Sequence, residues 1–167
     1  MSGQTPPSSR PRVLILGIGN LLLGDEGVGV HAAREIATLS LPDNVAVVDG
    51  GTGGFHLLSL FSDHDILVLI DATLDDNPPG TVRELRPRFA NDYPRTLSAH
   101  DIGLRDLVET AALTGAHPDV HLIIVSIRSL QDMSTQLSPP VAAAIPDVIA
   151  RVQRILHSIA DTRIPVP

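Results

Sequence analysis

Three residues that could bind a metal ion stand near segment boundaries of this 167-residue chain. Glu26 follows a glycine-rich turn, Asp71 directly follows the most apolar run, and His100 precedes a segment with helical spacing. Two carboxylates and one imidazole form a mixed ligand set that suits a borderline divalent metal such as nickel or zinc, with coordination positions left open. The residue types therefore favour a metal site, although the intervals between them match no known motif.

Asp25 stands beside Glu26, and an acidic pair at the start of a helix has a simpler interpretation. Carboxylates there accept hydrogen bonds from free backbone N–H groups and interact favourably with the helix dipole. One carboxylate would suffice for that purpose, and this pair follows glycines that permit the close approach of a ligand. Asp71 could similarly cap a turn, but a carboxylate among buried neighbours needs a partner, and a metal ion is one such partner.

The turn Gly17-Ile18-Gly19 is similar to the opening of a dinucleotide-binding motif, with Asp49 where a ribose-binding acid would stand. The third glycine of that motif is replaced by Leu22. The helix that would hold a pyrophosphate opens with Asp25 and Glu26, whose charges would repel phosphate. The pattern therefore disfavours a nucleotide-dependent enzyme.

Composition excludes several other classes of protein. The absence of cysteine rules out disulfides, thiolate metal sites and a cysteine nucleophile. There is no HExxH pair and no G-x-S-x-G turn, and a lone loop histidine such as His100 is most often only solvated. The net charge of −7 and the lack of a basic cluster make nucleic acid an unexpected partner. No apolar run approaches the roughly 18 residues of a membrane span. The N-terminus lacks the apolar core of a signal peptide, so we expect a cytoplasmic protein.

Strand-like and helix-like segments alternate along the chain. Apolar runs predict strands at residues 13–16, 45–48, 66–70, 81–85 and 121–127, and helical spacing predicts helices at 27–39, 53–61, from about 101, and at 139–160. This alternation predicts a mainly parallel sheet covered on both faces, and such sheets bind ligands at the carboxyl ends of their strands. Arg83 and Glu84 place the fourth strand at a sheet edge, where charge is tolerated. We expect a flexible arm at 1–11, one domain at 12–160 and a tail at 161–167.

Five segments resemble the hydrogenase maturation protease family, the endopeptidases that finish [NiFe] hydrogenase large subunits. They are Leu16-Gly17-Ile18-Gly19-Asn20, Leu23-Gly24-Asp25-Glu26-Gly27-Val28-Gly29, Asp49-Gly50-Gly51-Thr52, Ile70-Asp71-Ala72 and Ser98-Ala99-His100-Asp101-Ile102-Gly103-Leu104. Each segment is modest alone, but five in the family's order and spacing are highly specific, and they span most of the chain.

The resemblance implies an α/β fold, a three-layer α/β/α sandwich with a five-stranded mixed sheet of order 2-1-3-5-4 whose strand 4 is antiparallel. It implies that Glu26, Asp71 and His100 occupy the metal-binding and catalytic positions. Asp25, the acid before Glu26, joins the predicted catalytic set. The loop Asp49-Gly50-Gly51-Thr52 is implied to lie beside the site, where it would contact the bound metal or substrate.

The implied activity is removal of the C-terminal extension from a nickel-loaded [NiFe] hydrogenase large-subunit precursor. We expect the protein to be a monomer. The metal would be nickel presented by the substrate, with zinc as the alternative. A non-catalytic nickel-reading chaperone of the large subunit would use the same residues, so it stays open as a second interpretation. After the last strand the chain reads Ser126-Ile127-Arg128-Ser129, where relatives often have a Gly-Ile-x-Pro-like stretch, and this departure bears on the choice of substrate.

Overall fold

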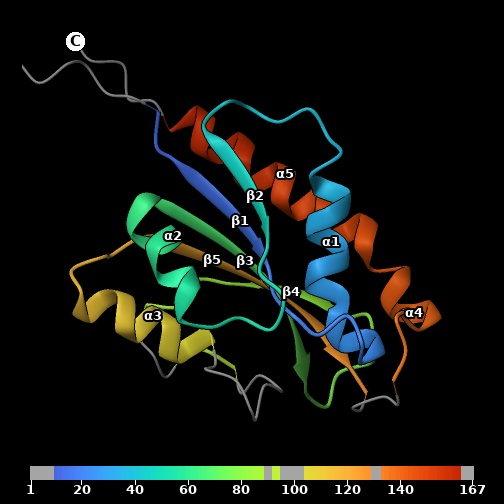
Figure 1. The fold of residues 1–167 in the computed structure, drawn as a ribbon. Coiled ribbons are helices and arrows are strands. Elements are labelled where there is room, and N and C mark those ends of the chain that lie inside the picture. The colour runs from blue at the N-terminus through green and yellow to red at the C-terminus, as the bar shows by residue number, and fades with distance from the viewer. Residues whose placement is uncertain (1–9, 89–91, 95–103, 129–132, 163–167) are drawn as a thin grey trace, which may run out of the picture.

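The central sheet has four parallel strands and one antiparallel edge strand (Figure 1). The computed structural model describes residues 10–88, 92–94, 104–128 and 133–162. Its strands are β1 (Val13–Gly17), β2 (Val45–Asp49), β3 (Ile66–Leu74), β4 (Val82–Leu85) and β5 (Asp119–Ile127). They lie in the order β2-β1-β3-β5-β4, and β4 pairs antiparallel with β5. The predicted strand order and the antiparallel edge strand are therefore confirmed.

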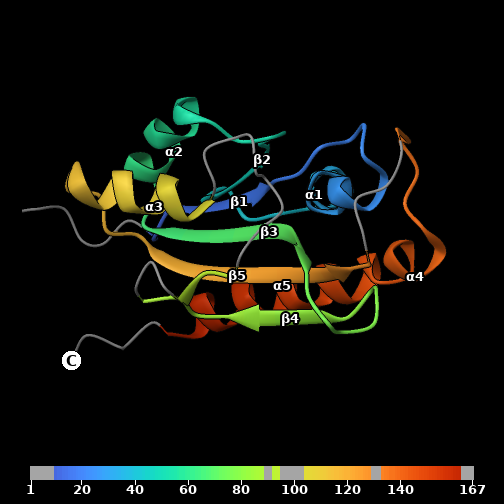
Figure 2. The ribbon, with the colours of Figure 1, turned by 90° about the horizontal axis from the view of Figure 1, so that it is seen from below.

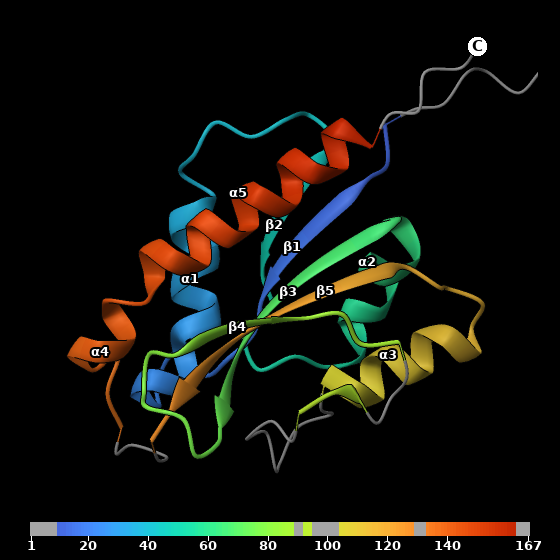
Figure 3. The same cartoon turned by 180° about the vertical axis from the view of Figure 1, so that it is seen from behind.

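Helices cover both faces of the sheet, which makes three layers (Figures 2 and 3). One face carries α1 (Val28–Ile36), α4 (Pro139–Ala142) and α5 (Ile145–Asp161), and the other carries α2 (Leu58–Asp63) and α3 (Leu104–Leu113). Two short 3-10 turns, η1 (Gly24–Gly27) and η2 (Phe55–Leu57), lead into α1 and α2. The predicted α/β/α sandwich is thus confirmed.

β1 shows why the central strands are continuous apolar runs. Val13 and Ile15 pack with α1 and α5, whereas Leu14 and Leu16 pack with α2 and α3. All four are at most 1% exposed, because alternate side chains of a central strand face opposite layers. Burial of each such side chain contributes about 1.5–3 kcal/mol. The strand is therefore firmly held on both faces, and the turn that follows it starts from a fixed point.

The C-terminal helical segment differs from the prediction of a single helix at 139–160. It forms two helices, α4 and α5, and α5 begins only at Ile145. Pro146 lies in the first turn of α5. Proline lacks a backbone N–H and clashes with the preceding turn inside a helix, but both effects are harmless at a helix start. Pro146 therefore favours a new helix over a continuous one.

The strand that precedes Asp71 was predicted too short. β3 does not end at Ile70 but continues to Leu74, so that Asp71 lies inside the strand. The neighbouring strand β5 is equally long and pairs with β3 through Leu74 and Ile127. Asp71 and Thr73 interrupt the apolar pattern that marks a strand in the sequence, yet the backbone pairing with β5 continues past them.

The predicted helices of the first half have shifted boundaries. The helix expected at 27–39 is α1, which begins at Val28 and ends at Ile36, and the acidic pair lies before it in η1. The helix expected at 53–61 is η2 followed by α2. The helix expected from about residue 101 is described from Leu104 onward as α3. Within the described ranges, no helix is long and apolar enough to cross a membrane.

Candidate active site

Asp71 is the buried carboxylate of the candidate site. Only 7% of the residue is exposed, and its Oδ1 accepts a hydrogen bond of 2.8 Å from the backbone N–H of Ala72. Burial raises the pKa of Asp71 to about 8, the Ala72 N–H opposes that rise, and the negative charge of Glu26 adds to it. A buried carboxylate beside a second acid has a strong electrostatic preference for a proton or a cation.

The charge of Glu26 acts on Asp71 because the turn η1 packs against β3. Gly19 permits this arrangement. A Cβ atom there would lie 2.0 Å from the carbonyl oxygen of Glu26, and the backbone φ of +148° is one that side-chain-bearing residues rarely adopt. The chain after β1 can therefore pass against the backbone of Glu26, which holds the η1 turn close to β3, the strand that carries Asp71.

The third predicted ligand, His100, lies outside the described residues, so its position relative to Glu26 and Asp71 stays a prediction. Among the described residues, no three histidine, aspartate or glutamate side chains gather closely enough to hold a metal ion. The chemistry of the described pair nevertheless suits a cation. The negative charge of Glu26 adds to the cost of ionising buried Asp71, and a divalent ion beside them would relieve both the repulsion and the burial of charge.

Asp25 links the η1 turn to the start of α4. It is 3% exposed, and its carboxylate accepts one hydrogen bond from the Ser138 backbone N–H at 2.6 Å and another from the Ser138 hydroxyl at 2.8 Å. Neither η1 nor α1 has a side-chain hydrogen bond at its N-cap. Asp25 therefore does more than precede the helix that follows it, because its carboxylate also holds the beginning of a different helix.

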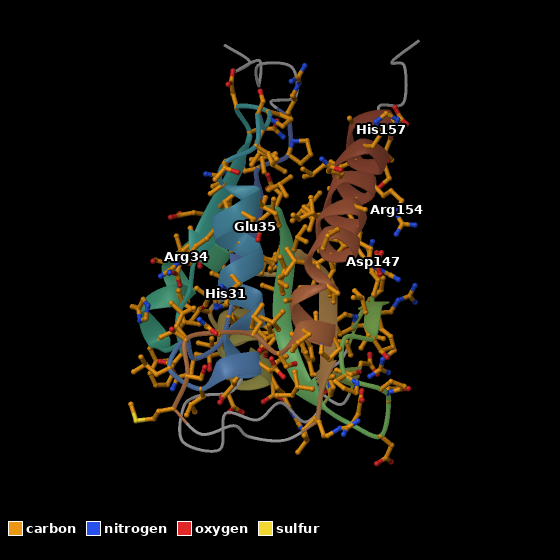
Figure 4. The ribbon with its side chains drawn as sticks, turned by 90° about the vertical axis from the view of Figure 1, so that its right-hand side faces the viewer. His31, Arg34, Glu35, Asp147, Arg154 and His157 are labelled. Carbon is orange, nitrogen blue, oxygen red and sulfur yellow. The ribbon has the colours of Figure 1, made fainter. Side chains whose placement is uncertain are left out.

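The loop Asp49-Gly50-Gly51-Thr52 lies against the turn that follows β1. The backbone N–H of Gly50 donates to the Gly17 carbonyl at 2.8 Å, and the N–H of Gly19 donates to the Gly51 carbonyl at 2.7 Å. Asp49 itself accepts a hydrogen bond from the Gly51 N–H at 3.0 Å and forms a 2.8 Å ion pair with Arg34 of α1. Arg34 lies on the side of α1 away from α5 (Figure 4). The loop is thus fixed at the carboxyl ends of the parallel strands, where Glu26 and Asp71 also lie.

Two of these partners, Arg34 and Ser138, were not predicted from the sequence. Ser138 directly precedes Pro139 and Pro140, and serine before proline is a recognisable signal for the start of a helix. That signal could have identified Ser138 as a helix cap but not its hydrogen bonds to Asp25. Arg34 stands among exposed residues of α1, and its pairing with Asp49 depends on how α1 packs beside β2.

Gly17, which belongs to the turn that is similar to a nucleotide-binding motif, has a packing role here, as Gly29 of α1 has. A Cβ atom on Gly17 would lie 2.1 Å from the carbonyl oxygen of Gly29, and one on Gly29 would lie 2.3 Å from the carbonyl oxygens of Ile18 and Ile70. These glycines let α1 lie directly on the ends of β1 and β3. Their presence is thereby explained without a phosphate, which removes the main reason for expecting a nucleotide.

Comparison with known proteins shows which family this chain is similar to. The sequence model of the family described as hydrogenase maturation protease matches residues 30–155. The hydrogenase expression/formation protein HupD of Rhizobium leguminosarum bv. viciae is 35% identical over 158 residues, which cover 91% of this chain and 77% of the relative. The hydrogenase 2 maturation protease of Escherichia coli (strain K12) is 32% identical over 157 residues, which cover 92% of this chain and 96% of the relative.

The fold agrees with solved structures of the same kind. The hydrogenase maturating endopeptidase HybD from E. coli superposes with a TM-score of 0.78 at 33% identity, over 88% of this chain and 93% of that chain. The [NiFe] hydrogenase maturation protease HybD from Thermococcus kodakarensis superposes with a TM-score of 0.72 at 27% identity, over 87% of this chain and 99% of that chain. The chain therefore belongs to the hydrogenase maturation protease family and is an endopeptidase of that family.

Proposed function

We propose that this endopeptidase removes the C-terminal extension of a [NiFe] hydrogenase large-subunit precursor after the precursor has received its nickel. In this proposal the nickel belongs to the substrate, and Glu26, Asp71 and His100 contact it. The observation that carries the proposal is the approach of Glu26 to buried Asp71, because this pair favours an added cation. Zinc is the alternative ion, since the same ligand types suit it.

Nickel held by the precursor would bring the scissile bond to these side chains by proximity. Hydrolysis adds water across the peptide bond. The water oxygen bonds to the carbonyl carbon, a site carboxylate accepts the proton that the water loses, the C–N bond breaks, and the released amine takes up a proton. Glu26 can serve as that carboxylate, as can Asp71 once a bound cation favours its ionised form, and Asp49 lies on the loop beside them.

The test is to mix the protein with its precursor, nickel-loaded and nickel-free, and to record intact masses over time. We expect a short C-terminal peptide to be lost from the loaded form alone. Glu26→Gln should abolish the loss, whereas Glu35→Gln, a matched change at an exposed acid of α1, should leave it unchanged (Figure 4). Cleavage that ignores nickel would retain the peptidase and refute the nickel-reading role.

The same experiment addresses the chaperone interpretation. A stable complex between the protein and the nickel-loaded precursor, with no change of mass, would favour a chaperone that uses the same residues. The monomeric state and the cytoplasmic location also remain predictions. Light scattering coupled to size-exclusion chromatography would check the first, and fractionation of cells would check the second.

A further inference from the structure

Large apolar side chains are exposed unevenly over the described part of the molecule. Six of them are exposed, namely Leu22, Leu39, Phe55, Leu74, Leu113 and Met133. Four of the six belong to segments at the carboxyl ends of the parallel strands: Leu22 follows β1, Phe55 follows β2, Leu74 ends β3 and Met133 follows β5. Each parallel strand is therefore followed or ended by one exposed apolar side chain at the carboxyl end of the sheet, where Glu26 and Asp71 lie.

Two of these side chains belong to segments that are joined by backbone hydrogen bonds. The N–H of Ser134 donates to the Leu22 carbonyl at 2.9 Å, and the N–H of Gly24 donates to the Ser134 carbonyl at 2.7 Å. Leu22 and Met133 are therefore held on one ordered platform, although both are more than half exposed. The exposed part of these side chains gains nothing from folding, and apolar side chains exposed at the end of a sheet that carries a site suit contact with another protein.

We propose that Leu22, Phe55, Leu74 and Met133, hereafter the apolar rim, form a docking surface for the folded large-subunit precursor. This inference rests on the proposed function. Any protein whose scissile bond reaches Glu26 and Asp71 must cover the carboxyl end of the sheet, where the apolar rim lies. The apolar rim would bind the precursor through apolar contact, and the site residues would act on the bond so presented. The rim thus sets affinity for the precursor without taking part in hydrolysis.

The test compares the double variant Leu22→Ser/Met133→Ser with Leu113→Ser, using nickel-loaded precursor. Leu113 is a matched control. It is 88% exposed, as Met133 is 80% exposed, but it ends α3 near the amino ends of the parallel strands. We expect the double variant to raise KM about tenfold or more, equivalent to about 1.4 kcal/mol, with kcat changed less than threefold. Leu113→Ser should change neither value by more than twofold.

A folded double variant with unchanged KM would refute the docking surface, as would an equal effect of Leu113→Ser. Thermal unfolding of all three proteins checks that they are folded. If the wild-type protein fails to shorten the precursor, the proposed function fails instead. Direct binding of the precursor to the wild-type, double-variant and control proteins would then still decide the role of the apolar rim.

A second inference concerns Asp25 and rests on its hydrogen bonds. The buried carboxylate joins the turn that carries Glu26 to Ser138, which precedes α4 and lies close in sequence to Met133. Both oxygens of Asp25 are engaged by Ser138, and the residue is 3% exposed. We infer that Asp25 is a positioning residue, which acts through Glu26 and does not exchange protons with the substrate.

The discriminating pair of variants is Asp25→Asn and Asp25→Ala. An asparagine side chain can still accept the hydrogen bond from the Ser138 N–H, and its amide can donate to the Ser138 hydroxyl. We expect Asp25→Ala to lower kcat at least 30-fold, and Asp25→Asn to retain kcat within about fivefold with an unchanged pH profile. Equal losses in the two variants would instead make Asp25 catalytic. Ser138→Ala removes one hydrogen bond only and should give an intermediate kcat, even if Asp25→Ala fails to fold.

Discussion

Acidic side chains lie near both ends of the paired strands β3 and β5, but the environments of their charges differ. At the amino end, Asp119 accepts two hydrogen bonds from the Arg86 guanidinium at 2.6 and 2.7 Å, and Arg86 also contacts buried His121. At the carboxyl end, the pKa of Asp71 is set by three influences, namely burial, the Ala72 N–H and the charge of Glu26. None of these three brings a positive charge to Asp71.

The difference separates a structural acid from a functional one. The charge of Asp119 is neutralised by the chain's own arginine, and both partners are about half exposed, so the pair stabilises the fold only modestly. Asp71 is held where ionisation is costly unless a cation arrives. Folding tolerates such a residue at a site whose missing charge is supplied by a ligand, and perturbed carboxyl groups gather at functional sites for this reason.

The largest expected effect contrasts Asp71→Asn with Asp119→Asn in the cleavage of nickel-loaded precursor. We expect Asp71→Asn to lower the single-turnover rate about 100- to 1,000-fold, roughly the loss seen when one group that stabilises charge in the transition state is removed. Asp119→Asn should lower it less than twofold. Similar losses in the two variants would break the distinction between the ends of the strands.

Stability should change in the opposite direction to activity. Without a metal ion, both the folded and unfolded states have a protonated Asp71 below pH 4, so its ionisation costs no stability there. Between pH 4 and about 8 the unfolded chain ionises at Asp71 while the folded chain stays protonated, so the free energy of unfolding falls as pH rises through this window.

The Asp71→Asn variant should lack this contribution and be more stable than the wild type at pH 8, by a few kcal/mol in order of magnitude. Urea unfolding of the metal-free proteins at pH 5 and pH 8 measures the difference, which should be larger at pH 8. A variant that is less stable than the wild type at both values would show that the buried charge of Asp71 is already compensated within the chain.

Arg86→Met tests the paired end and should have a smaller effect. Since Arg86 and Asp119 are about half exposed, the loss of their ion pair should cost no more than about 1 kcal/mol of unfolding free energy. The difference from the wild type should shrink in high salt, which screens exposed charges. Urea unfolding at low and high salt checks this, and the rate of cleavage should stay within twofold of the wild type.

Arg34→Met should have the smallest effect on stability, because the Arg34 side chain is 58% exposed. We expect less than about 0.5 kcal/mol, the low end of the range for exposed ion pairs. The variant sharpens the comparison because Asp49 lies at the carboxyl end, yet it is paired with arginine as Asp119 is. A loss of more than tenfold in kcat would show that Arg34 holds Asp49 in a catalytic position.

Much of the architecture was predictable from local patterns. Apolar runs such as Val13 to Leu16 can only be buried between two layers, so they identify the central strands. Charged Arg83 and Glu84 correctly placed β4 at the sheet edge. The end of β3 was not predictable, because Asp71 breaks the apolar pattern while the backbone pairing with β5 continues to Leu74.

The candidate site divides in the same way. The sequence by itself determined which residue types could bind a cation and which segments follow the strands, because apolar periodicity and glycine positions are local properties. Only the tertiary structure decided that Glu26 lies near Asp71, that Asp25 holds Ser138 and that Asp49 pairs with Arg34. These contacts join segments distant in sequence, and their strengths depend on burial, which exists only once the layers have packed.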